Sequence, residues 1–433
     1  MSDYMFMLEN HLSPEQNRAV LAVERAAAEA EVRAFLTGGA LRDMLGGFPI
    51  RGLEFTVEGP TAKLVKILEK KHGVKSVATD PTRKAASLVF PADVAAEIAM
   101  AHTARYPRPG ANPVIRPATI HDDLNRRDFT INSIAISLSK ASRGLLLDPA
   151  NGLGDLERRE LRANSHHTLH DDPARILRML RLRTRLGFDL NERTQSQYAN
   201  VREAGLESKI DSIALRAEFR EMANEPNPGG LLEILEREKL TALFSPALAG
   251  QKLNVAGFSR LLKVRQMVPF GVDFRVENFG LFLHVLEEKL SDKERKDLAR
   301  RVKLTRTEQE APKKLEQRAR KLERALQSAK LSRASLVYQL LRNTPGEEII
   351  FLMMRTTKRL VHDRIKHYLL KYLETASEVT DRDLAHLNLT PGTPAFEKAK
   401  LDRILAILDG RIRKPAPPPP PPPQLTSAWA RRG

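Results

Sequence analysis

The pattern of apolar and polar residues changes along the chain. Between residues 31 and 147, short β-branched and apolar runs predict strands at residues 32–36, 53–57, 87–90 and 95–100. A helix is predicted at residues 61–72, and a Ser-Pro pair before an Ala-, Glu- and Arg-rich run predicts another at residues 14–34. Strands interspersed with helices in this way indicate a small domain built on a mixed sheet.

From about residue 155 the strand signals fade and helical spacing takes over. Ile176, Leu177, Leu180 and Leu182 are spaced to form one buried stripe, and this predicts a helix at residues 172–186. The chain from there to about residue 413 is rich in Leu, Arg, Lys and Glu and is predicted to be helical. The expected fold class is therefore α+β, a small mixed-sheet head followed by an all-α neck, body and tail.

The same changes divide the chain into five predicted segments. These are an N-terminal helical segment (1–30), the head (31–147), a helical neck (148–240), a basic helical body and tail (241–413) and a proline-rich tail (414–433). The last segment holds an unbroken run from Pro417 to Pro423, which is predicted to be a disordered polyproline II spacer. The alternative is that this run is a ligand for a proline-recognising domain.

Charge indicates the class of partner. The chain has 71 Lys and Arg against 54 Asp and Glu, a net charge of +17, and residues 291–330 hold 14 basic and 7 acidic side chains. An excess of this size favours nucleic acid over a merely solvated basic surface. Only 5% of residues are aromatic, so contact with backbone phosphates is expected to outweigh base stacking.

Other classes of structure are excluded or disfavoured by composition. The chain has no cysteine, which excludes disulfides and thiolate metal sites and fits a reducing cytoplasm. No run of 18 apolar residues predicts a membrane span, and the first ten residues lack the features of a secretion signal. A cytoplasmic location is therefore expected.

Two segments carry candidate chemistry for phosphates. In the first, a buried strand at 35–37 runs into Gly38 and Gly39, and Arg42-Asp43 follows. Glycines let a backbone approach a phosphate closely, and free amides at a helix start favour anions. In the second, residues 126–132 read Arg-Arg-Asp-Phe-Thr-Ile-Asn, and paired guanidinium groups suit phosphate. Taken alone, the second segment could also be a basic helix start capped by Asp128.

These motifs, in this order, resemble the class II tRNA nucleotidyltransferase and bacterial poly(A) polymerase family, from about residue 30 to 240 and patchily to 413. The resemblance implies a nucleotidyltransferase head in which Gly38, Gly39 and Arg42 form the turn near the triphosphate. It implies that Arg126 and Arg127 meet phosphates and that Asp128 and Asn132 hold the ribose edge.

A further match lies at residues 171–178, Asp-Asp-Pro-Ala-Arg-Ile-Leu-Arg. In the family this motif reads the edges of the incoming CTP and ATP, which implies base-recognising roles for Asp172 and Arg175, with Arg178 beside them. Asp171 stands where the family usually has glutamate. The alternative is a surface ion pair at i,i+3 that caps a helix.

The metal site departs from the family pattern. The family strand carries Asp-x-Asp for catalytic Mg²⁺, and residues i and i+2 of a strand share one face. Here those positions hold Gly52 and Glu54, with Glu97 as the candidate carboxylate from a neighbouring strand. Glu54 is predicted either to bind metal or to be a solvated strand carboxylate.

Further differences lie nearby. His102 and Ala104 stand where the family usually has arginine and glutamate, and Asp43 and Glu58 are candidates to compensate for the missing carboxylate. The segment 148–156 resembles the family's hinge, with Gly152 and Gly154 as the flexible points, or it is an ordinary turn. Weaker matches to the family lie at residues 216–229 and 380–392.

Three hypotheses about function follow. The first is a working enzyme that binds an RNA 3′ end, most simply that of tRNA, and adds C or A from CTP or ATP with release of pyrophosphate; polyadenylation is a close variant. The second is a catalytically impaired pseudoenzyme that retains RNA or nucleotide binding, because Gly52 offers no ligand. The third, a degraded paralogue without a role, is disfavoured by the coherent amphipathic pattern. The sequence leaves open whether catalysis survives and what the product is.

Overall fold

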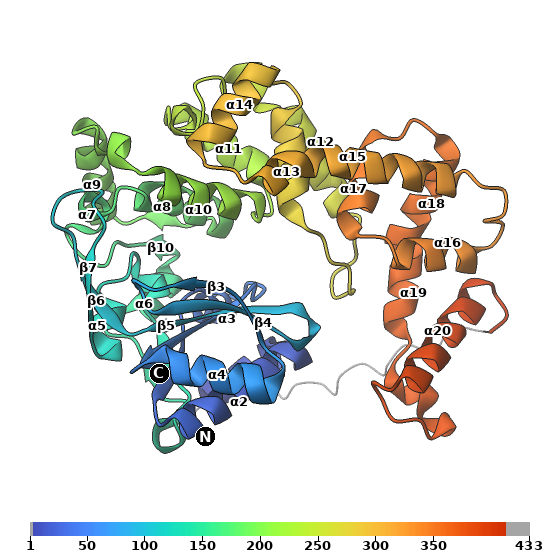
Figure 1. Ribbon diagram of the computed structural model, residues 1–433, viewed down its shortest axis with the longest axis horizontal. Coiled ribbons are helices and arrows are strands. Elements are labelled where there is room, and N and C mark those ends of the chain that lie inside the picture. Colours follow the sequence, from blue (N-terminus) through green and yellow to red (C-terminus); the bar gives the residue numbers. More distant parts are fainter. Residues whose placement is uncertain (1–2, 413–433) are drawn as a thin grey trace, which may run out of the picture. The chain divides into compact units, whose positions relative to one another are not determined.

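The computed structural model describes residues 3–412, which form two compact units (Figure 1). The first unit runs to Glu225 and includes residues 237–244; the second contains residues 226–236 and the chain from Ser245 onward. The predicted tail at 414–433, with its proline run, lies outside the described residues. Among the described helices, none is long and apolar enough to cross a membrane.

The first unit is built on a mixed sheet, as predicted. Within the described residues this sheet has seven strands in the order β3-β4-β5-β2-β1-β8-β9, and β2 and β5 are the parallel neighbours. The strands are β1 (Arg33–Thr37), β2 (Leu53–Glu58), β3 (Lys75–Asp80), β4 (Ala85–Phe90), β5 (Val94–Met100), β8 (Ala135–Ser137) and β9 (Leu146–Leu147). A separate antiparallel pair joins β6 (His102–Arg105) to β7 (Val114–Pro117).

Three helices accompany the sheet: α2 (Pro14–Ala30), α3 (Gly39–Leu45) and α4 (Thr61–His72). The α4 helix has the predicted bounds, and the four predicted strands lie within β1, β2, β4 and β5 except for Val32. The helix predicted at 14–34 is too long, because Glu31 takes a left-handed conformation with φ of 58° and ends α2. The next residues enter β1. The edge strand β3 escaped prediction because its residues are mostly exposed and show no apolar alternation.

The neck is helical apart from one pair of two-residue strands, β10 (Glu160–Leu161) and β11 (Asp189–Leu190). Its helices are α6 (Gly152–Arg158), α7 (Thr168–Asp171), α8 (Arg175–Leu186), α9 (Glu192–Glu203) and α10 (Ser212–Ala223). The helix predicted at 172–186 begins only at Arg175. Asp172 precedes Pro173, and a residue before proline is disfavoured in the helical region, so Asp172 is extended with ψ of 89°.

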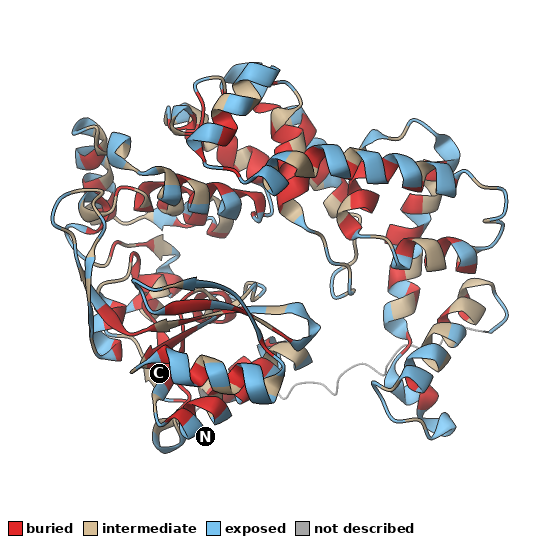
Figure 2. Cartoon of the chain, viewed as in Figure 1, coloured by how far each residue is buried: buried red, intermediate tan, exposed pale blue. Residues whose placement is uncertain are grey.

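The described part of the second unit is helical. It comprises α11 (Pro228–Arg237), α12 (Val255–Arg265), α13 (Asn278–Glu287), α14 (Asp292–Arg301), α15 (Arg306–Leu326), α16 (Ala334–Arg342), α17 (Gly346–Arg355), α18 (Arg359–His367), α19 (Leu373–Glu378) and α20 (Pro394–Leu408). The α15 helix packs on α13 and α17 through an apolar stripe that includes Leu315, Leu322 and Leu326. Its other face is exposed and carries basic side chains (Figure 2).

Candidate nucleotide and metal site

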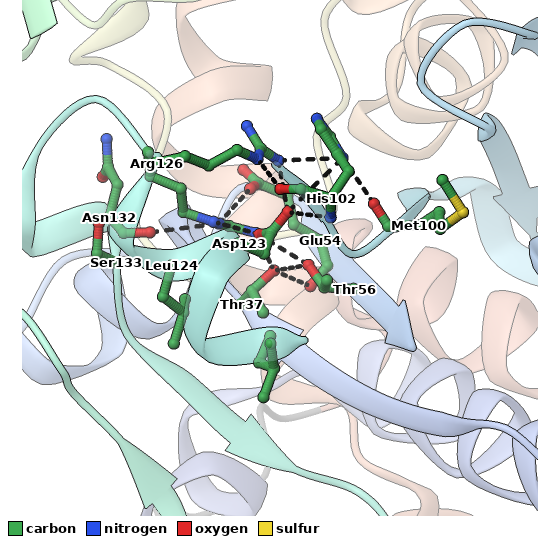
Figure 3. A network of polar contacts seen from close by, with 12 residues as sticks. Thr37, Glu54, Thr56, Met100, His102, Asp123, Leu124, Arg126, Asn132 and Ser133 are labelled. Atoms are coloured by element: carbon green, nitrogen blue, oxygen red, sulfur yellow. Dashed lines mark hydrogen bonds and ion pairs between the residues drawn. The ribbon is translucent and has the colours of Figure 1, made fainter. Parts of the chain in front are cut away.

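A buried carboxylate organises the paired arginines of residues 126 and 127. Asp123 lies on the short helix α5 (Ile120–Asn125), which begins with a capping box at Thr119, and its side chain is 1% exposed. It accepts hydrogen bonds from Nη2 of Arg126 at 2.5 Å, from Nε of Arg127 at 3.1 Å and from the backbone N–H of His102 at 3.2 Å (Figure 3). One carboxylate thus fixes two guanidinium groups and an adjoining strand.

Two positive neighbours explain why Asp123 stays ionised. Burial raises the pKa of Asp123, but the charges of Arg127 and Arg126 and the hydrogen bonds that it accepts lower the pKa by more. Its pKa therefore lies below the usual range for aspartate.

Arg127 reaches from α5 to the sheet. Its Nη2 donates to Oγ1 of Thr56 at 2.9 Å and to Oγ1 of Thr37 at 3.1 Å, and its Nη1 donates to the carbonyl of Asn132 at 3.3 Å. The same Nη1 lies 4.0 Å from Oε2 of Glu54. Arg127 therefore links Asp123 of α5 to β1 and β2 at the floor of the site. Contact between Arg127 and phosphate stays a prediction.

Arg126 and His102 pack against each other beside this floor. Arg126 donates from Nε to the carbonyl of His102 at 2.6 Å, and its side chain is 22% exposed. The imidazole of His102 is buried and donates from Nδ1 to the carbonyl of Met100 at 2.7 Å. Burial and the charge of Arg126 lower the pKa of His102. His102 thus has a packing role, and Arg126 keeps part of its surface available for an anion.

Glu54 and Glu97 lie side by side, as the metal prediction requires. They are direct partners in the parallel register of β2 and β5, so both side chains lie on one face of the sheet. Glu97 already pairs with Arg83, whose Nη2 lies 3.2 Å from Oε1. The carboxylate of Glu54 extends over the Gly-Gly turn: a Cβ added to Gly38 would lie 2.2 Å from Oε2, and one added to Gly39 would lie 3.2 Å from Oε1. The φ of +69° at Gly38 favours glycine, and the missing Cβ leaves room for the Glu54 carboxylate in this position.

The carboxylate of Glu54 is partly exposed and has charged neighbours of both signs. Its side chain is 53% exposed, and the protein shields the remainder from water. This desolvation raises the pKa of Glu54, and the charges of Glu97 and Asp128 raise it further, whereas Arg127 and Arg42 lower it. A cation at this position would relieve the mutual repulsion of the carboxylates.

Gly52 has no structural need to be glycine. Its φ lies outside the left-handed region, and a Cβ there would meet nothing closer than the carbonyl oxygen of Ala95 at 3.9 Å. Space for an aspartate at the family's first metal-ligand position is therefore present. The missing carboxylate is a chemical difference and not a consequence of the fold.

The two candidates to compensate for Gly52 are used elsewhere. Asp43 accepts hydrogen bonds from Arg42 at 2.9 Å and from Arg185 at 2.5 Å. Glu58 accepts one from the backbone N–H of Ile120 at 2.6 Å and pairs with Arg33 at 2.5 Å. Across residues 3–412, no group of three or more His, Asp or Glu side chains is arranged to hold a metal ion. The site therefore offers only the pair of Glu54 and Glu97.

A second polar cluster lies around Asp128. Nη1 of Arg178 lies 2.8 Å from Oδ2 of Asp128, and Nδ2 of Asn132 donates to Oδ1 at 3.0 Å. Arg42 completes the cluster by donating from Nη1 to Oδ1 of Asn132 at 2.7 Å. Burial raises the pKa of Asp128, but Arg178 and Arg175 lower it far more, so it is strongly depressed. Four of the predicted nucleotide-binding residues are thus brought together from three segments.

The predicted base-recognising pair lies next to this cluster. Nε of Arg175 is 3.4 Å from Oδ2 of Asp172, and Nη2 donates to the carbonyl of Arg126 at 3.5 Å. The i,i+3 ion pair of the alternative interpretation is thus present, and Asp172 also accepts from the N–H of Ala174 at 3.2 Å at the helix start. The side chain of Arg175 is only 10% exposed, and base recognition by this pair stays a prediction. The two motifs predicted from separate parts of the sequence therefore meet in the folded chain.

Gly152 is also held by a close approach. A Cβ there would lie 2.2 Å from the carbonyl oxygen of Thr130, and Oδ1 of Asp148 accepts from its N–H at 2.7 Å. A Cβ on Gly154 would meet only side-chain atoms, at 3.0 Å from Asn151. The hinge role of this segment stays a prediction.

Sequence reasoning missed three residues of the site. Asp123, Thr37 and Thr56 hold Arg127, but they belong to no phosphate- or metal-binding pattern. A signal existed for Asp123, because an aspartate three and four residues before two arginines lies on the same face of a helix. For the two threonines, only the pairing of β1 with β2 reveals the contact.

We expect Asp123→Asn to destabilise the protein by about 3 kcal/mol or more at pH 7, because it leaves two partly buried arginines without their counter-charge. Chemical denaturation measures the loss, with Glu69→Gln, at an exposed position of α4, as the control. A carboxylate with a depressed pKa stabilises above its unfolded-state pKa and ceases to do so as pH falls through the folded-state pKa. The difference between natural and variant chains should therefore shrink in acid; a difference that is small at pH 7, or that grows in acid, would contradict this account.

Comparison with known proteins agrees with this geometry. Residues 34–162 match the family described as "Poly A polymerase head domain". The chain is 31% identical over 344 residues to an A-adding tRNA nucleotidyltransferase of Aquifex aeolicus, covering 78% of this chain and 40% of that protein. It is 37% identical over 221 residues to a CC-adding tRNA nucleotidyltransferase of Deinococcus radiodurans, covering 51% of this chain and 58% of that protein. The chain thus spans about half the length of these curated relatives.

Solved structures resemble the whole described chain. A CCA-adding enzyme in an apo form superposes with a TM-score of 0.54 at 25% identity, covering 94% of each chain. A tRNA-processing enzyme in an apo form superposes with a TM-score of 0.52 at 25% identity, covering 92% of this chain and 99% of the other. Together these similarities show that the chain carries a poly A polymerase head domain and is similar along most of its length to tRNA nucleotidyltransferases and CCA-adding enzymes.

Proposed function

We propose that this chain binds the 3′ end of an RNA, most simply tRNA, and adds C or A nucleotides from CTP or ATP with release of pyrophosphate. The observation that carries the proposal is the meeting of the two nucleotide motifs around Asp128. Arg178 from the neck pairs with this carboxylate at 2.8 Å, and Arg175 reaches the carbonyl of Arg126. We assign a role to each segment in this proposal. The head (31–147) carries the nucleotidyltransferase site, the neck (148–240) binds the nucleotide base and RNA, and the body and tail (241–413) bind RNA.

In the proposed reaction the RNA 3′-hydroxyl attacks the α-phosphorus of the nucleotide, a new P–O bond forms, and pyrophosphate leaves. Arg126 has exposed guanidinium surface with which to meet phosphate. Asp128 and Asn132 form a fixed edge for the ribose, because hydrogen bonds hold both side chains in place. Asp172 and Arg175 present a carboxylate and a guanidinium side by side to the base.

Mg²⁺ is the proposed cofactor, and the donor set fits one ion better than two. Mg²⁺ is commonly held by one or two carboxylates and completes its shell with water and substrate phosphates. Glu54 and Glu97 meet that requirement, whereas Gly52 leaves a two-metal shell one carboxylate short. When bound, the ion would neutralise charge that develops on the reacting phosphate.

A second candidate function is a protein that binds RNA or nucleotide without turnover. It is favoured by Gly52 and by the ion pair that Arg83 makes with Glu97. The polar contacts of Arg126, Asp128 and Asn132 do not depend on a metal, so binding could outlast catalysis. The two candidates differ in whether the natural chain incorporates nucleotide.

The test uses tRNA without its 3′ end, labelled CTP or ATP, and Mg²⁺ or Mn²⁺. We expect the natural chain to incorporate label, Glu54→Ala to abolish it, and Gly52→Asp to raise the rate by about 100-fold, since a group that stabilises developing charge is typically worth that much. The control is Glu69→Ala, which removes an exposed carboxylate on α4. A natural chain that binds tRNA but incorporates nothing, while Gly52→Asp does, would support the second candidate instead.

The proposed RNA-binding surface includes the exposed face of α15. Lys313, Lys321 and Arg324 are exposed there, on the side away from its apolar stripe. Phosphate contacts release counterions, so each lost contact weakens binding and lowers its salt dependence.

Reversing these three charges to glutamate should lower tRNA affinity and reduce the slope of log K against log salt by about 3. Filter binding at several salt concentrations measures both quantities. The matched control reverses Lys63, Lys66 and Lys70 on α4, which changes the net charge by the same amount. If the two triple variants lose the same amount of tRNA affinity, then net charge, and not the α15 face, governs binding.

A further inference from the structure

A tyrosine outside every predicted motif lies against the proposed base-recognising pair. Tyr106 directly follows β6, and its ring centroid is 6.0 Å from the guanidinium carbon of Arg175. This is the range of a cation–π contact. With Asp172 at 3.4 Å from Nε, the guanidinium of Arg175 has a carboxylate and an aromatic ring as neighbours.

The segment that carries Tyr106 is anchored to the neck. It is the connection between β6 and β7, which passes beside α7 in Figure 1. The backbone N–H of Gly110 donates to the carbonyl of Asp171, the last residue of α7, at 3.0 Å. A Cβ at Gly110 would lie 2.8 Å from the carbonyl oxygen of Lys209, and its φ of +71° also demands glycine. This connection therefore rests on the neck at two points near Asp172.

The phenol of Tyr106 remains uncharged at neutral pH. Burial raises the pKa of Tyr106, although the charge of Arg175 acts in the opposite direction. Tyr106 is therefore a neutral ring and hydroxyl beside a cation. Its effect on Arg175 is geometric.

A base-reading arginine must keep one orientation. Its N–H donors match one particular base edge only when the guanidinium plane is fixed. A guanidinium group that rotates freely can hydrogen-bond to the edges of several different bases. Asp172 limits this rotation at Nε, and the Tyr106 ring supplies a second limit on the guanidinium. The carbonyl of Arg126 accepts from Nη2 as a third, weaker contact at 3.5 Å.

We propose that Tyr106 is a positioning residue for specificity, which holds the guanidinium of Arg175 in the orientation that distinguishes cytosine and adenine from uracil and guanine. This inference rests on the proposed function, because it assigns a role within the same nucleotide site. It adds the β6–β7 connection to the site, as the element that delivers Tyr106. Tyr106 touches neither the reacting phosphate nor the carboxylates of β2 and β5 in this role.

The test is the ratio of affinities, because loss of packing alone would lower all affinities together. Equilibrium binding of CTP, ATP, UTP and GTP in the presence of Mg²⁺ is compared for natural protein, Tyr106→Phe and Tyr106→Leu. We expect Tyr106→Leu to reduce discrimination about tenfold, which is the scale of a desolvated cation–π contact. Tyr106→Phe keeps the ring and should keep most of the discrimination, while tripolyphosphate, which lacks a base, should bind equally to all three.

The control is Tyr198→Leu, which removes a tyrosine of the neck that hydrogen-bonds Glu238 at 2.6 Å. It should leave discrimination unchanged. A folded Tyr106→Leu protein that discriminates as well as the natural chain would overturn this inference and leave the proposed function standing. A natural chain that binds no nucleotide, or binds all four equally, would overturn both.

Discussion

The buried carboxylate of Asp123 is the interaction on which the nucleotide site depends. It lies at 1% exposure between two arginines, and without it those partly buried cations would lack their shared counter-charge. Isolated charges are very costly to bury, and paired and hydrogen-bonded charges are tolerated. Through Arg127 the same carboxylate ties α5 to Thr37 and Thr56 on the sheet, and through the backbone of His102 it holds the start of β6. One short helix thereby fixes the floor and one wall of the site.

The arginines of α8 form further ion pairs, which connect the head to the neck. Arg178, Arg181 and Arg185 are three and four residues apart and so share a helix face. Arg178 pairs with Asp128 and Glu218, Arg181 with Glu218 and Glu225, and Arg185 with Asp43. From Asp43 the chain of contacts continues through Arg42 and Asn132 back to Asp128. Because each of these arginines has a carboxylate partner, a helix so rich in arginine can be mostly buried.

The metal site contrasts with this polar framework. In the framework each buried arginine has a carboxylate partner. Glu54 and Glu97, in contrast, are two negative charges side by side, and the positive charges that pair with them are Arg127 and Arg83. Gly52 removes a ligand without altering backbone or packing, because the position is open and its backbone is ordinary. The proposed nucleotide-positioning residues and the proposed metal ligands are therefore separate sets of side chains in this chain. Evolution could change one while leaving the other intact, and both candidate functions draw on this separation.

The sequence by itself determined the fold class, the order of the head and neck, and the identity of the nucleotide motifs. Local signals sufficed for these: β-branched runs for β1, β2, β4 and β5, helical spacing for α4 and most of α8, and a contiguous signature at residues 126–132. It also showed that Gly52 offers no side-chain ligand to a metal, since that follows from residue identity alone.

Only the tertiary structure decided which side chains meet. Tyr106 and Arg175 are 69 positions apart, and Thr37 and Arg127 are 90 apart, so no local pattern records their contact. The structure also showed that Asp43 and Glu58 are occupied by arginines and a backbone N–H, and that Glu54 lies over the Gly38 turn. The physical reason is that strand pairing and buried charge compensation act between segments distant in sequence. They select partners through the packed fold, and that information lies in no single stretch of residues.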